Sequence, residues 1–343
     1  MPDSRPETPD SSYDAILLVS FGGPEAVDEV IPFLENVLRG RNVSRDRMLA
    51  VAEHYFLFNG ISPINEQNRK LIEALRIELE DNGPQLPIYW GNRNWRPLLN
   101  DTIRQMAAEG IKHALAFVTS AYSSYSSCRQ YLEDIAKAQQ GVGPGAPRID
   151  KIRAFYNHPG FIQANVDSVS NALAQIPESR RPAAELVFTA HSIPLSMAQS
   201  SSYEAQVLET ARLVSAGVAH NNWSLAYQSR SGSPAQPWLG PDILERLRNL
   251  RNSGVTAVVL APIGFVSDHM EIVYDLDVEA KDLCARLGIN LVRASSAGTH
   301  PAFVRMIRDL IVERIDGSAG RQFMGDLGPS PDACAPGCCL FKN

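Results

Sequence analysis

The stretch ELVFTAHSIPLSMA, residues 185–198, places a histidine at the end of an apolar run. Leu186, Val187 and Phe188 have the character of a buried strand, and His191 follows where that strand should end. In open α/β sheets, ligands bind beyond the carboxyl ends of the parallel strands. His191 is therefore a candidate site residue. As an isolated histidine it could equally cap a helix or bond to a backbone carbonyl, so its neighbours must decide between these roles.

The same kind of apolar run recurs along the chain and alternates with segments of helical period. This alternation is typical of helices that cover both faces of a parallel sheet, so the predicted class is α/β in two similar halves. Two helices, in residues 68–83 and 100–110, each end at a glycine. The predicted strands are residues 14–21, 86–92, 114–121, 151–157, 184–191, 223–229, 256–263 and 289–295.

The predicted organisation has five parts. Residues 1–13 are polar and acidic and are expected to form a disordered tail. Residues 14–160 form the N-terminal half, residues 161–300 the C-terminal half, and residues 301–316 a closing helix. Residues 317–343 form a Gly/Pro/Ser-rich extension that contains cysteines.

Composition excludes several classes of protein. The formal net charge of −6 provides no broad positive field for a nucleic acid. The longest apolar run, residues 257–266, is about half the roughly 20 residues that a membrane helix needs. The first residues carry no export signal, so we expect a cytoplasmic protein. We also expect a monomer, because no segment has an amphipathic stripe left over once both sheets are covered.

A row of acidic residues follows the seventh predicted strand, in APIGFVSDHMEIVYDLDVEAKDL, residues 261–283. Glu271, Asp275 and Glu279 lie at i, i+4 and i+8, so a helix would put all three on one face, where like charges repel unless cations visit. A solvated acidic face is the alternative. Because the row begins at a strand end, we favour a path for Fe²⁺ or Zn²⁺ that ends at one imidazole and one carboxylate. No nucleotide-binding fingerprint and no G-x-S-x-G elbow is present in the sequence.

Five blocks together resemble the ferrochelatase family, in order and spacing, over residues 14–315. They are LLVSFGGPE at 17–25, GISPIN at 60–65, TAHSIP at 189–194, QSRSGSPAQPWLGPD at 228–242 and PIGFVSDHMEIVYDLD at 262–277. The resemblance implies insertion of Fe²⁺ into a porphyrin between two Rossmann-like halves, each with a four-stranded parallel sheet flanked by helices. The acidic N-terminus and the cysteine tail look most like the actinobacterial branch. That branch implies coproporphyrin III as substrate, with protoporphyrin IX as the alternative.

The resemblance also implies roles for the acidic row and the histidine. His191 would accept a pyrrole proton or ligate the metal, since imidazole titrates near neutral pH. Glu271 would complete the metal site. Asp275, Asp277 and Glu279 would relay Fe²⁺ inwards or protons outwards. The sequence leaves open whether His191 acts mainly as base or as ligand.

Residues expected to contact the porphyrin come from the first half. Ser62 matches a family ligand contact, and Tyr131 matches another if the loop is shifted by one residue, which leaves Tyr125 as a competitor. Arg39 and Arg41 are candidates for the propionates because guanidinium groups suit carboxylates, although exposed arginines are ordinary. Phe21 can pack on the macrocycle but cannot ligate iron.

Four of the five cysteines are assigned together. Cys334, Cys338 and Cys339 lie in the tail, and Cys128 matches or adjoins the remote ligand position of cluster-bearing ferrochelatases, so the resemblance implies a [2Fe-2S] cluster on these four thiolates. Zinc or free reactive thiols are the alternatives. Cys284 is expected to be a small buried hydrophobe.

Two other functions stay open. A chelatase for cobalt or nickel would share the fold and the histidine, but would not be expected to carry both the 228–242 block and the acidic block. A non-catalytic haem carrier would have no use for the acidic row. Transient contacts with other enzymes of haem synthesis are also expected.

Overall fold

A computed structural model describes residues 13–40, 43–231, 236–335 and 337–340. Within these residues two four-stranded sheets are formed, and every strand pair in them is parallel. The strands are β1 Ala15–Ser20, β2 Ile88–Asn92, β3 His113–Val118, β4 Arg148–Lys151, β5 Glu185–His191, β6 Trp223–Gln228, β7 Ala257–Ala261 and β8 Asn290–Arg293. The sheet orders, β2-β1-β3-β4 and β6-β5-β7-β8, have the same topology and confirm the predicted two-half α/β fold.

The fourth predicted strand, residues 151–157, is wrong. Strand β4 ends at Lys151, and the backbone amide of Ile152 donates the last bond to the neighbouring strand, at Ala116. The apolar residues that follow, Phe155 and Tyr156 among them, are buried in the core without pairing in a sheet. Their hydrophobic pattern reflects burial beside helices, which periodicity over so short a run does not separate from strand pairing.

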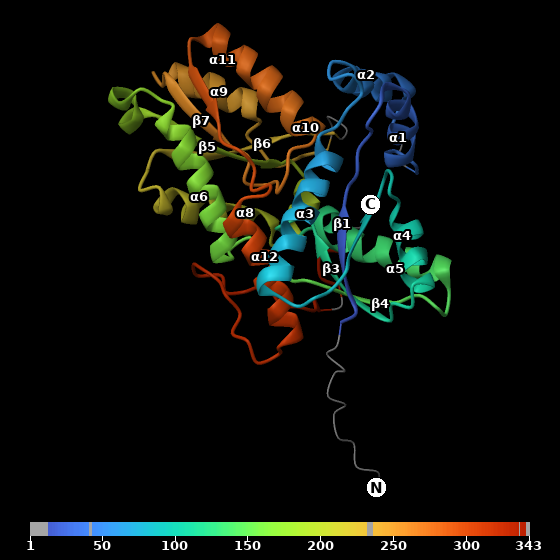
Figure 1. Cartoon of the computed structure of the whole chain (residues 1–343). Coiled ribbons are helices and arrows are strands. Elements are labelled where there is room, and N and C mark those ends of the chain that lie inside the picture. The colour runs from blue at the N-terminus through green and yellow to red at the C-terminus, as the bar shows by residue number, and fades with distance from the viewer. Residues whose placement is uncertain (1–12, 41–42, 232–235, 336, 341–343) are drawn as a thin grey trace.

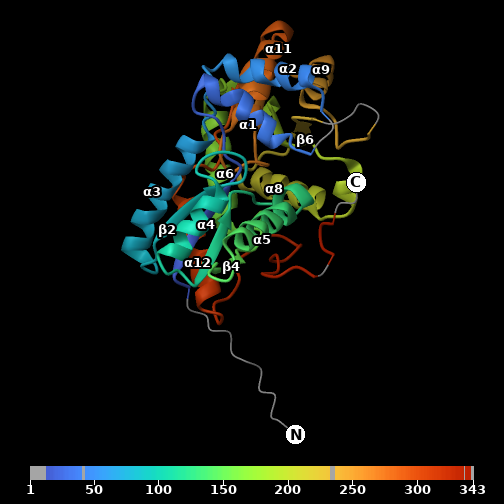
Figure 2. The same cartoon turned by 90° about the vertical axis from the view of Figure 1, so that its right-hand side faces the viewer.

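Helices cover both sheets and fill the space between them (Figures 1 and 2). They are α1 Val30–Val37, α2 Arg45–Phe56, α3 Ile64–Asn82, α4 Leu99–Ala108, α5 Gln130–Val142, α6 Pro159–Ala174, α7 Leu195–Gln199, α8 Tyr203–Gly217, α9 Ile243–Asn252, α10 Met270–Ile272, α11 Lys281–Leu287 and α12 Pro301–Ile315. Two segments, Tyr125–Arg129 and Val273–Ala280, are π-helical. In the described residues, no helix combines the length and the apolar character needed to cross a bilayer.

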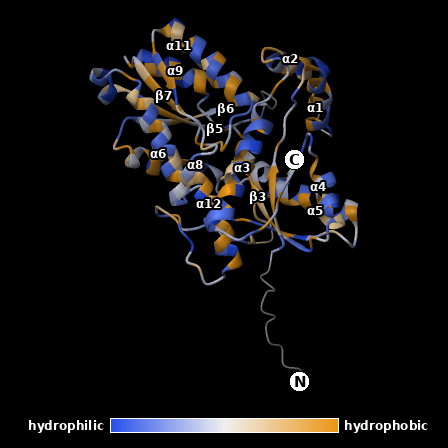
Figure 3. Ribbon diagram, viewed as in Figure 1, coloured by the Kyte–Doolittle hydropathy of each residue, from blue (hydrophilic) through white to orange (hydrophobic). Residues whose placement is uncertain are grey.

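The core follows from the alternation of side chains along the central strands. In β1, Ile16 and Leu18 point into a large apolar core that also contains Phe188 of β5, so this core is shared by the two halves. Leu17 and Val19 point to the other face, which α4 and α5 cover. The second sheet has its own outer layer, formed by α9 and α11. Figure 3 shows the strands as predominantly apolar ribbons, as expected for sheets covered on both faces.

The two halves exchange helices. Helix α6 leaves the first sheet and packs against β7 and β8, whereas α12 leaves the second sheet and packs against α3 and α6. The predicted boundary after residue 160 therefore falls inside α6, and the predicted closing helix at 301–316 corresponds to α12. Residues 1–12 of the predicted tail lie outside the described residues, while Tyr13 is buried.

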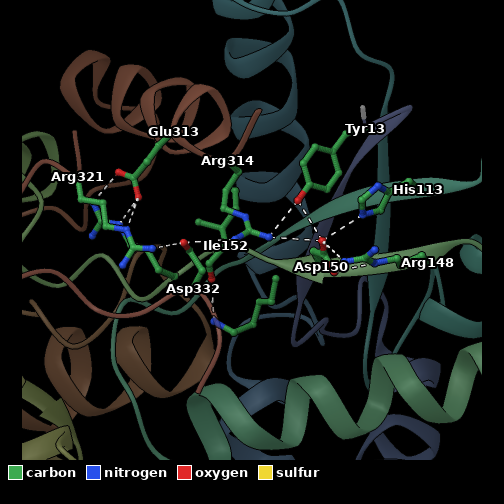
Figure 4. A network of polar contacts seen from close by, with 11 residues as sticks. Tyr13, His113, Arg148, Asp150, Ile152, Glu313, Arg314, Arg321 and Asp332 are labelled. Atoms are coloured by element: carbon green, nitrogen blue, oxygen red, sulfur yellow. Dashed lines mark hydrogen bonds and ion pairs between the residues drawn. The ribbon is translucent and has the colours of Figure 1, made fainter. Parts of the chain in front are cut away.

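Asp150 of the edge strand β4 is the centre of a polar network (Figure 4). Its carboxylate accepts hydrogen bonds from the Tyr13 hydroxyl at 3.0 Å and from Arg148 at 3.2 Å, and it lies 3.1 Å from the His113 Nε2. Arg314 of α12 also reaches it, at 3.4 Å. The network joins β3, β4 and α12. Because it lies at the amino ends of the strands, it does not contribute to the candidate site at their carboxyl ends.

The C-terminal extension is tied to this network. Asp332 pairs with Arg314, at 3.3 Å, and with Arg321 (Figure 4). The buried Arg153 guanidinium donates to the Gln322 carbonyl at 2.8 Å, and the Asn157 amide donates to the Gly328 carbonyl at 2.8 Å. The described residues of the extension contain no helix or strand, so side-chain contacts such as these hold it in place.

Replacing Glu313 with alanine should lower the free energy of unfolding by about 3–5 kcal/mol, measured by urea denaturation. The side chains of Arg153 and Glu313 are 1% and 8% exposed and form a two-pronged ion pair at 2.7 and 3.0 Å, so the substitution would leave a buried charge unpaired. The control is Glu80→Ala, which breaks the exposed Arg76–Glu80 pair and should leave stability nearly unchanged. Equal effects of the two substitutions would show that the Arg153 charge is not buried in solution.

Candidate active site

His191 lies at the carboxyl end of β5, a central strand of the second sheet. Its Nδ1 is 2.5 Å from the Ser192 carbonyl oxygen, which can only accept, so Nδ1 carries the proton and donates. The Ser192 backbone is itself fixed, because its amide donates to the Gln228 carbonyl at 2.8 Å and its hydroxyl to the Leu239 carbonyl at 2.8 Å. The ring is thereby oriented with Nε2 free to accept a proton or bind a metal.

Glu271 faces this nitrogen across the site. Its Oε2 lies 3.4 Å from His191 Nε2 and 3.8 Å from His269 Nδ1. The loop before α10 reaches this position by passing directly against β5, and a Cβ on Gly264 would lie 2.5 Å from the Cα of Ala190. Only a glycine allows this approach, which brings the 262–269 loop beside the end of the histidine strand.

The electrostatics of the pair are coupled. Burial alone would lower the pKa of His191, but the Glu271 carboxylate outweighs it and raises that pKa above the ordinary value. Burial would raise the pKa of Glu271, and the two histidines outweigh it and lower the pKa to about 2. The side chains are nevertheless 31% and 46% exposed. A metal ion can therefore reach them from solution.

The distance between the two atoms suits a shared metal ion. The His191 Nε2 and the Glu271 Oε2 lie 3.4 Å apart. If each were about 2.1 Å from a shared ion, the angle between the two bonds at the ion would be about 110°, close to the tetrahedral value. In the described parts of the chain, no group of three or more His, Cys, Asp or Glu side chains is arranged to hold a metal ion. Two protein ligands would leave positions open for water or for donor atoms of a second substrate, as in a site that passes its metal on.

The acidic row continues away from Glu271 along the π-helical segment. Asp275 accepts hydrogen bonds from the Ser229 hydroxyl at 2.5 Å and from the Gln228 amide at 3.4 Å. Burial, together with the carboxylates of Glu271 and Glu279, raises the pKa of Asp275 to about 7. Burial also raises the pKa of Glu279. Burial is thus the main cause of both shifts, and neighbouring carboxylates add to it.

Asp277 does not join this row. Its carboxylate is 2.7 Å from the Nε of Arg293, and the same guanidinium also pairs with Asp268 at 2.9 Å. A residue two positions from Asp275 faces the other side of the helix. A relay role for Asp277 stays a prediction that this ion pair does not favour.

The residues predicted to contact a porphyrin are placed very differently from one another. Phe21 is 37% exposed at the end of β1. Ser62 and Tyr131 are buried, and Tyr125 donates its hydroxyl to Glu133 at 3.1 Å. Arg39 is exposed directly after α1, and Arg41 lies outside the described residues. Of these residues, Phe21 therefore has an exposed ring, whereas Ser62 and Tyr131 have almost no exposed surface.

Arg93 is a residue that sequence reasoning missed. It follows β2, and its guanidinium lies 5.9 Å from the Phe21 ring centroid and 4.5 Å from that of Tyr131. It also pairs with Asp134, Nε to Oδ2, at 2.5 Å. Arg93 thus links two residues that were predicted separately. Its position at the carboxyl end of a strand was the available signal.

The four cysteines assigned to a cluster line a single cavity of about 480 Å³. Cys128 comes from the Tyr125–Arg129 segment, and the other three come from the extension. Interaction with Cys128 lowers the pKa of the Cys334 thiol, and the sulfurs of Cys338 and Cys339 lie 3.5 Å apart. The four thiols, from two distant parts of the chain, therefore line one cavity.

The tail turns sharply to bring both vicinal cysteines to this cavity. Cys339 has a φ of 54° and Gly337 a φ of 89°, both in the left-handed region, which a cysteine rarely occupies. Such an outlier favours a functional constraint on the turn. Cys284 lies elsewhere, on α11 in the core shared with α9, where burial raises the pKa of its thiol to about 11, as expected of an inert buried residue.

Comparisons with known proteins show the family to which the chain belongs. The ferrochelatase family model matches residues 13–315. A ferrochelatase of Rhodopirellula baltica is 55% identical over 96% of this chain and 94% of its own length, and a coproporphyrin III ferrochelatase of Streptomyces griseus is 48% identical over 99% and 96%. Among solved structures, SirB from Bacillus subtilis with Fe³⁺ superposes with a TM-score of 0.56 at 14% identity, covering 91% of this chain and 99% of that one, which shows a shared fold. The chain belongs to the ferrochelatase family.

Proposed function

We propose that this protein inserts Fe²⁺ into coproporphyrin III to give its iron complex in haem synthesis. The observation that carries the proposal is the His191–Glu271 pair, two exposed ligands 3.4 Å apart at the carboxyl end of a sheet. The choice of porphyrin is supported by relatives of 45–49% identity that are named coproporphyrin III ferrochelatases. The 55% identical relative is named ferrochelatase alone, so protoporphyrin IX is the alternative substrate.

In the proposed mechanism, the metal and the porphyrin meet at this pair. Neutral His191 presents Nε2 to the metal or to a pyrrole N–H, and its Nδ1 bond to Ser192 holds the ring in position. Glu271, ionised throughout the neutral range, contributes the anionic ligand and stabilises the imidazolium when His191 takes a proton. The porphyrin must distort to expose a nitrogen lone pair, so a site that favours the distorted form lowers the barrier.

The acidic row would carry metal ions to the His191–Glu271 pair or protons away from it. Asp275 has a pKa of about 7, so it can change protonation state near neutral pH, and it lies on the same face as Glu271. We assign Asp275 and Glu279 to the relay of metal ions inwards or protons outwards. Phe21 would pack on the macrocycle from the first half.

We also propose a resident [2Fe-2S] cluster on Cys128, Cys334, Cys338 and Cys339. The proposal is supported by the single cavity that these side chains line and by the left-handed turn at Cys339. When bound, such a cluster would exchange one electron and cross-link the extension to the first half. A cytoplasmic location, a monomeric state and transient contacts with other haem-synthesis enzymes stay predictions.

The test of the proposed function is anaerobic Fe²⁺ insertion into coproporphyrin III and protoporphyrin IX, followed side by side by absorbance. We expect kcat/KM to be at least about tenfold higher for coproporphyrin III, because its two additional carboxylates give the protein more charge to recognise. A preference for protoporphyrin IX would overturn the substrate. Porphyrin that binds but stays metal-free would identify a carrier instead of an enzyme.

A further inference from the structure

Helices α1 and α2 pack on each other through a small apolar cluster that is distinct from the main cores. It consists of the buried side chains of Val30, Phe33, Leu34, Met48, Ala52, Tyr55 and Met270, here called the α1–α2 cluster. Six of these residues come from the first half of the chain. Met270 alone comes from the second half, and it is 2% exposed. The second half thus inserts one side chain into the packing of α1 and α2.

Met270 immediately precedes Glu271, and contacts on both sides hold the same segment. Before it, the amide of Asp268 donates to the Gln67 Oε1 of α3 at 2.8 Å. After it, the ring of Tyr274 stacks on His54 of α2, with centroids 3.6 Å apart and planes 8° from parallel. The segment that carries Glu271 is therefore held by the first half at three successive points, of which Met270 is the nearest to Glu271.

The α1–α2 cluster also reaches the exposed ring expected to meet the porphyrin. Phe33 makes edge contacts with Phe21 at 6.4 Å and with Tyr55 at 5.8 Å between centroids. Burial, with the Glu271 carboxylate nearby, raises the pKa of Tyr55, so its phenol stays neutral beside that carboxylate. Packed side chains thus connect Phe21 in the first half to the neighbourhood of Glu271 in the second.

We propose that Met270 is a positioning residue, whose insertion into the α1–α2 cluster holds Glu271 against His191 and so completes the metal site. The inference rests on the proposed function, because Met270 acts through Glu271. Short helix α10 spans only Met270–Ile272, and its N-cap residue His269 provides no side-chain cap bond, so packing of the buried Met270 helps to fix the start of the helix. Loss of that packing would free Glu271 without removing any ligand.

The test compares three variants by binding of Co²⁺ alone to the free protein, measured by anaerobic calorimetry. Met270→Ala should weaken Co²⁺ binding about tenfold or more, the range found when residues that orient metal ligands are removed. Met270→Leu, which keeps the volume, should restore binding to within about twofold. The matched control is Met48→Ala, which removes a methionine from the same cluster but not the neighbour of Glu271. It should also stay within about twofold of the wild type.

A second readout separates positioning from general loosening. NMR titration of His191 should show its pKa falling in Met270→Ala towards its value in Glu271→Gln, because His191 has lost its carboxylate partner in both. In Met48→Ala the pKa should stay at the wild-type value. If Met270→Ala and Met48→Ala behave alike in both measurements, the inference is wrong. Wild-type protein that fails to insert iron would instead refute the proposed function, and neither result depends on the other.

Discussion

Replacing His191 with alanine should lower kcat/KM for Fe²⁺ insertion by about 10³-fold or more, with the fold intact. The substitution removes the His191 Nε2, which lies 3.4 Å from the Glu271 carboxylate, and with it the proposed proton acceptor and one proposed metal ligand. Steady-state kinetics with coproporphyrin III measure the loss. Circular dichroism and the thermal midpoint should stay close to wild type, because the His191 side chain is 31% exposed and supports little of the core.

The matched control is His300→Ala. His300 caps α12, where its Nδ1 accepts from the Ala302 amide at 3.2 Å and its Nε2 pairs with Asp167 at 3.1 Å. Its removal should cost about 1 kcal/mol of stability and leave kcat/KM unchanged. Normal turnover by His191→Ala would show that His191 is neither the proton acceptor nor an essential metal ligand. Equal losses in the two variants would point to damaged folding in place of lost chemistry.

Replacing Cys334 with serine should abolish the visible absorbance and the iron and sulfide content of a [2Fe-2S] cluster in protein purified or reconstituted anaerobically. Cys334 is the exposed member of the four, and a hydrogen bond from Cys128 lowers the pKa of its thiol, which suits a thiolate ligand. The loss should be nearly complete, because the tail would keep only its two vicinal thiols. Cys284→Ala is the control, since that thiol is buried in another core, and it should keep the full cluster content.

Two outcomes would contradict the cluster. One is wild-type protein that holds zinc and no sulfide, which would make the cavity a zinc site. The other is Cys334→Ser protein with unchanged absorbance, which would place the cluster on other ligands.

The fold was predictable from the sequence because it depends on local patterns. Central strands β1 and β5 are apolar on both faces, which predicts buried parallel strands. Gly83 in the sequence predicts where helix α3 ends. The fourth strand was misplaced because Phe155 and Tyr156 are buried by helices of both halves, and an apolar run does not reveal what covers it. The exchange of α6 and α12 between halves is a property of tertiary packing that no short window contains.

The site was only partly predictable, for a related reason. His191 and Glu271 follow strands, so strand-end reasoning and the family blocks identified both, yet nothing in the sequence fixes their separation of 3.4 Å. Arg93 also follows a strand but carries no motif. Met270 is an ordinary apolar residue whose role depends on α1 and α2, which lie far away in the chain.

The central claim is that one metal ion binds between His191 and Glu271, and anomalous diffraction from crystals soaked in Co²⁺ tests it most directly. We predict a peak at about 2.1 Å from His191 Nε2 and from a Glu271 oxygen, which disappears in His191→Ala crystals. Crystals that show no peak beside His191, whether or not metal is found in the cysteine cavity, would contradict the account.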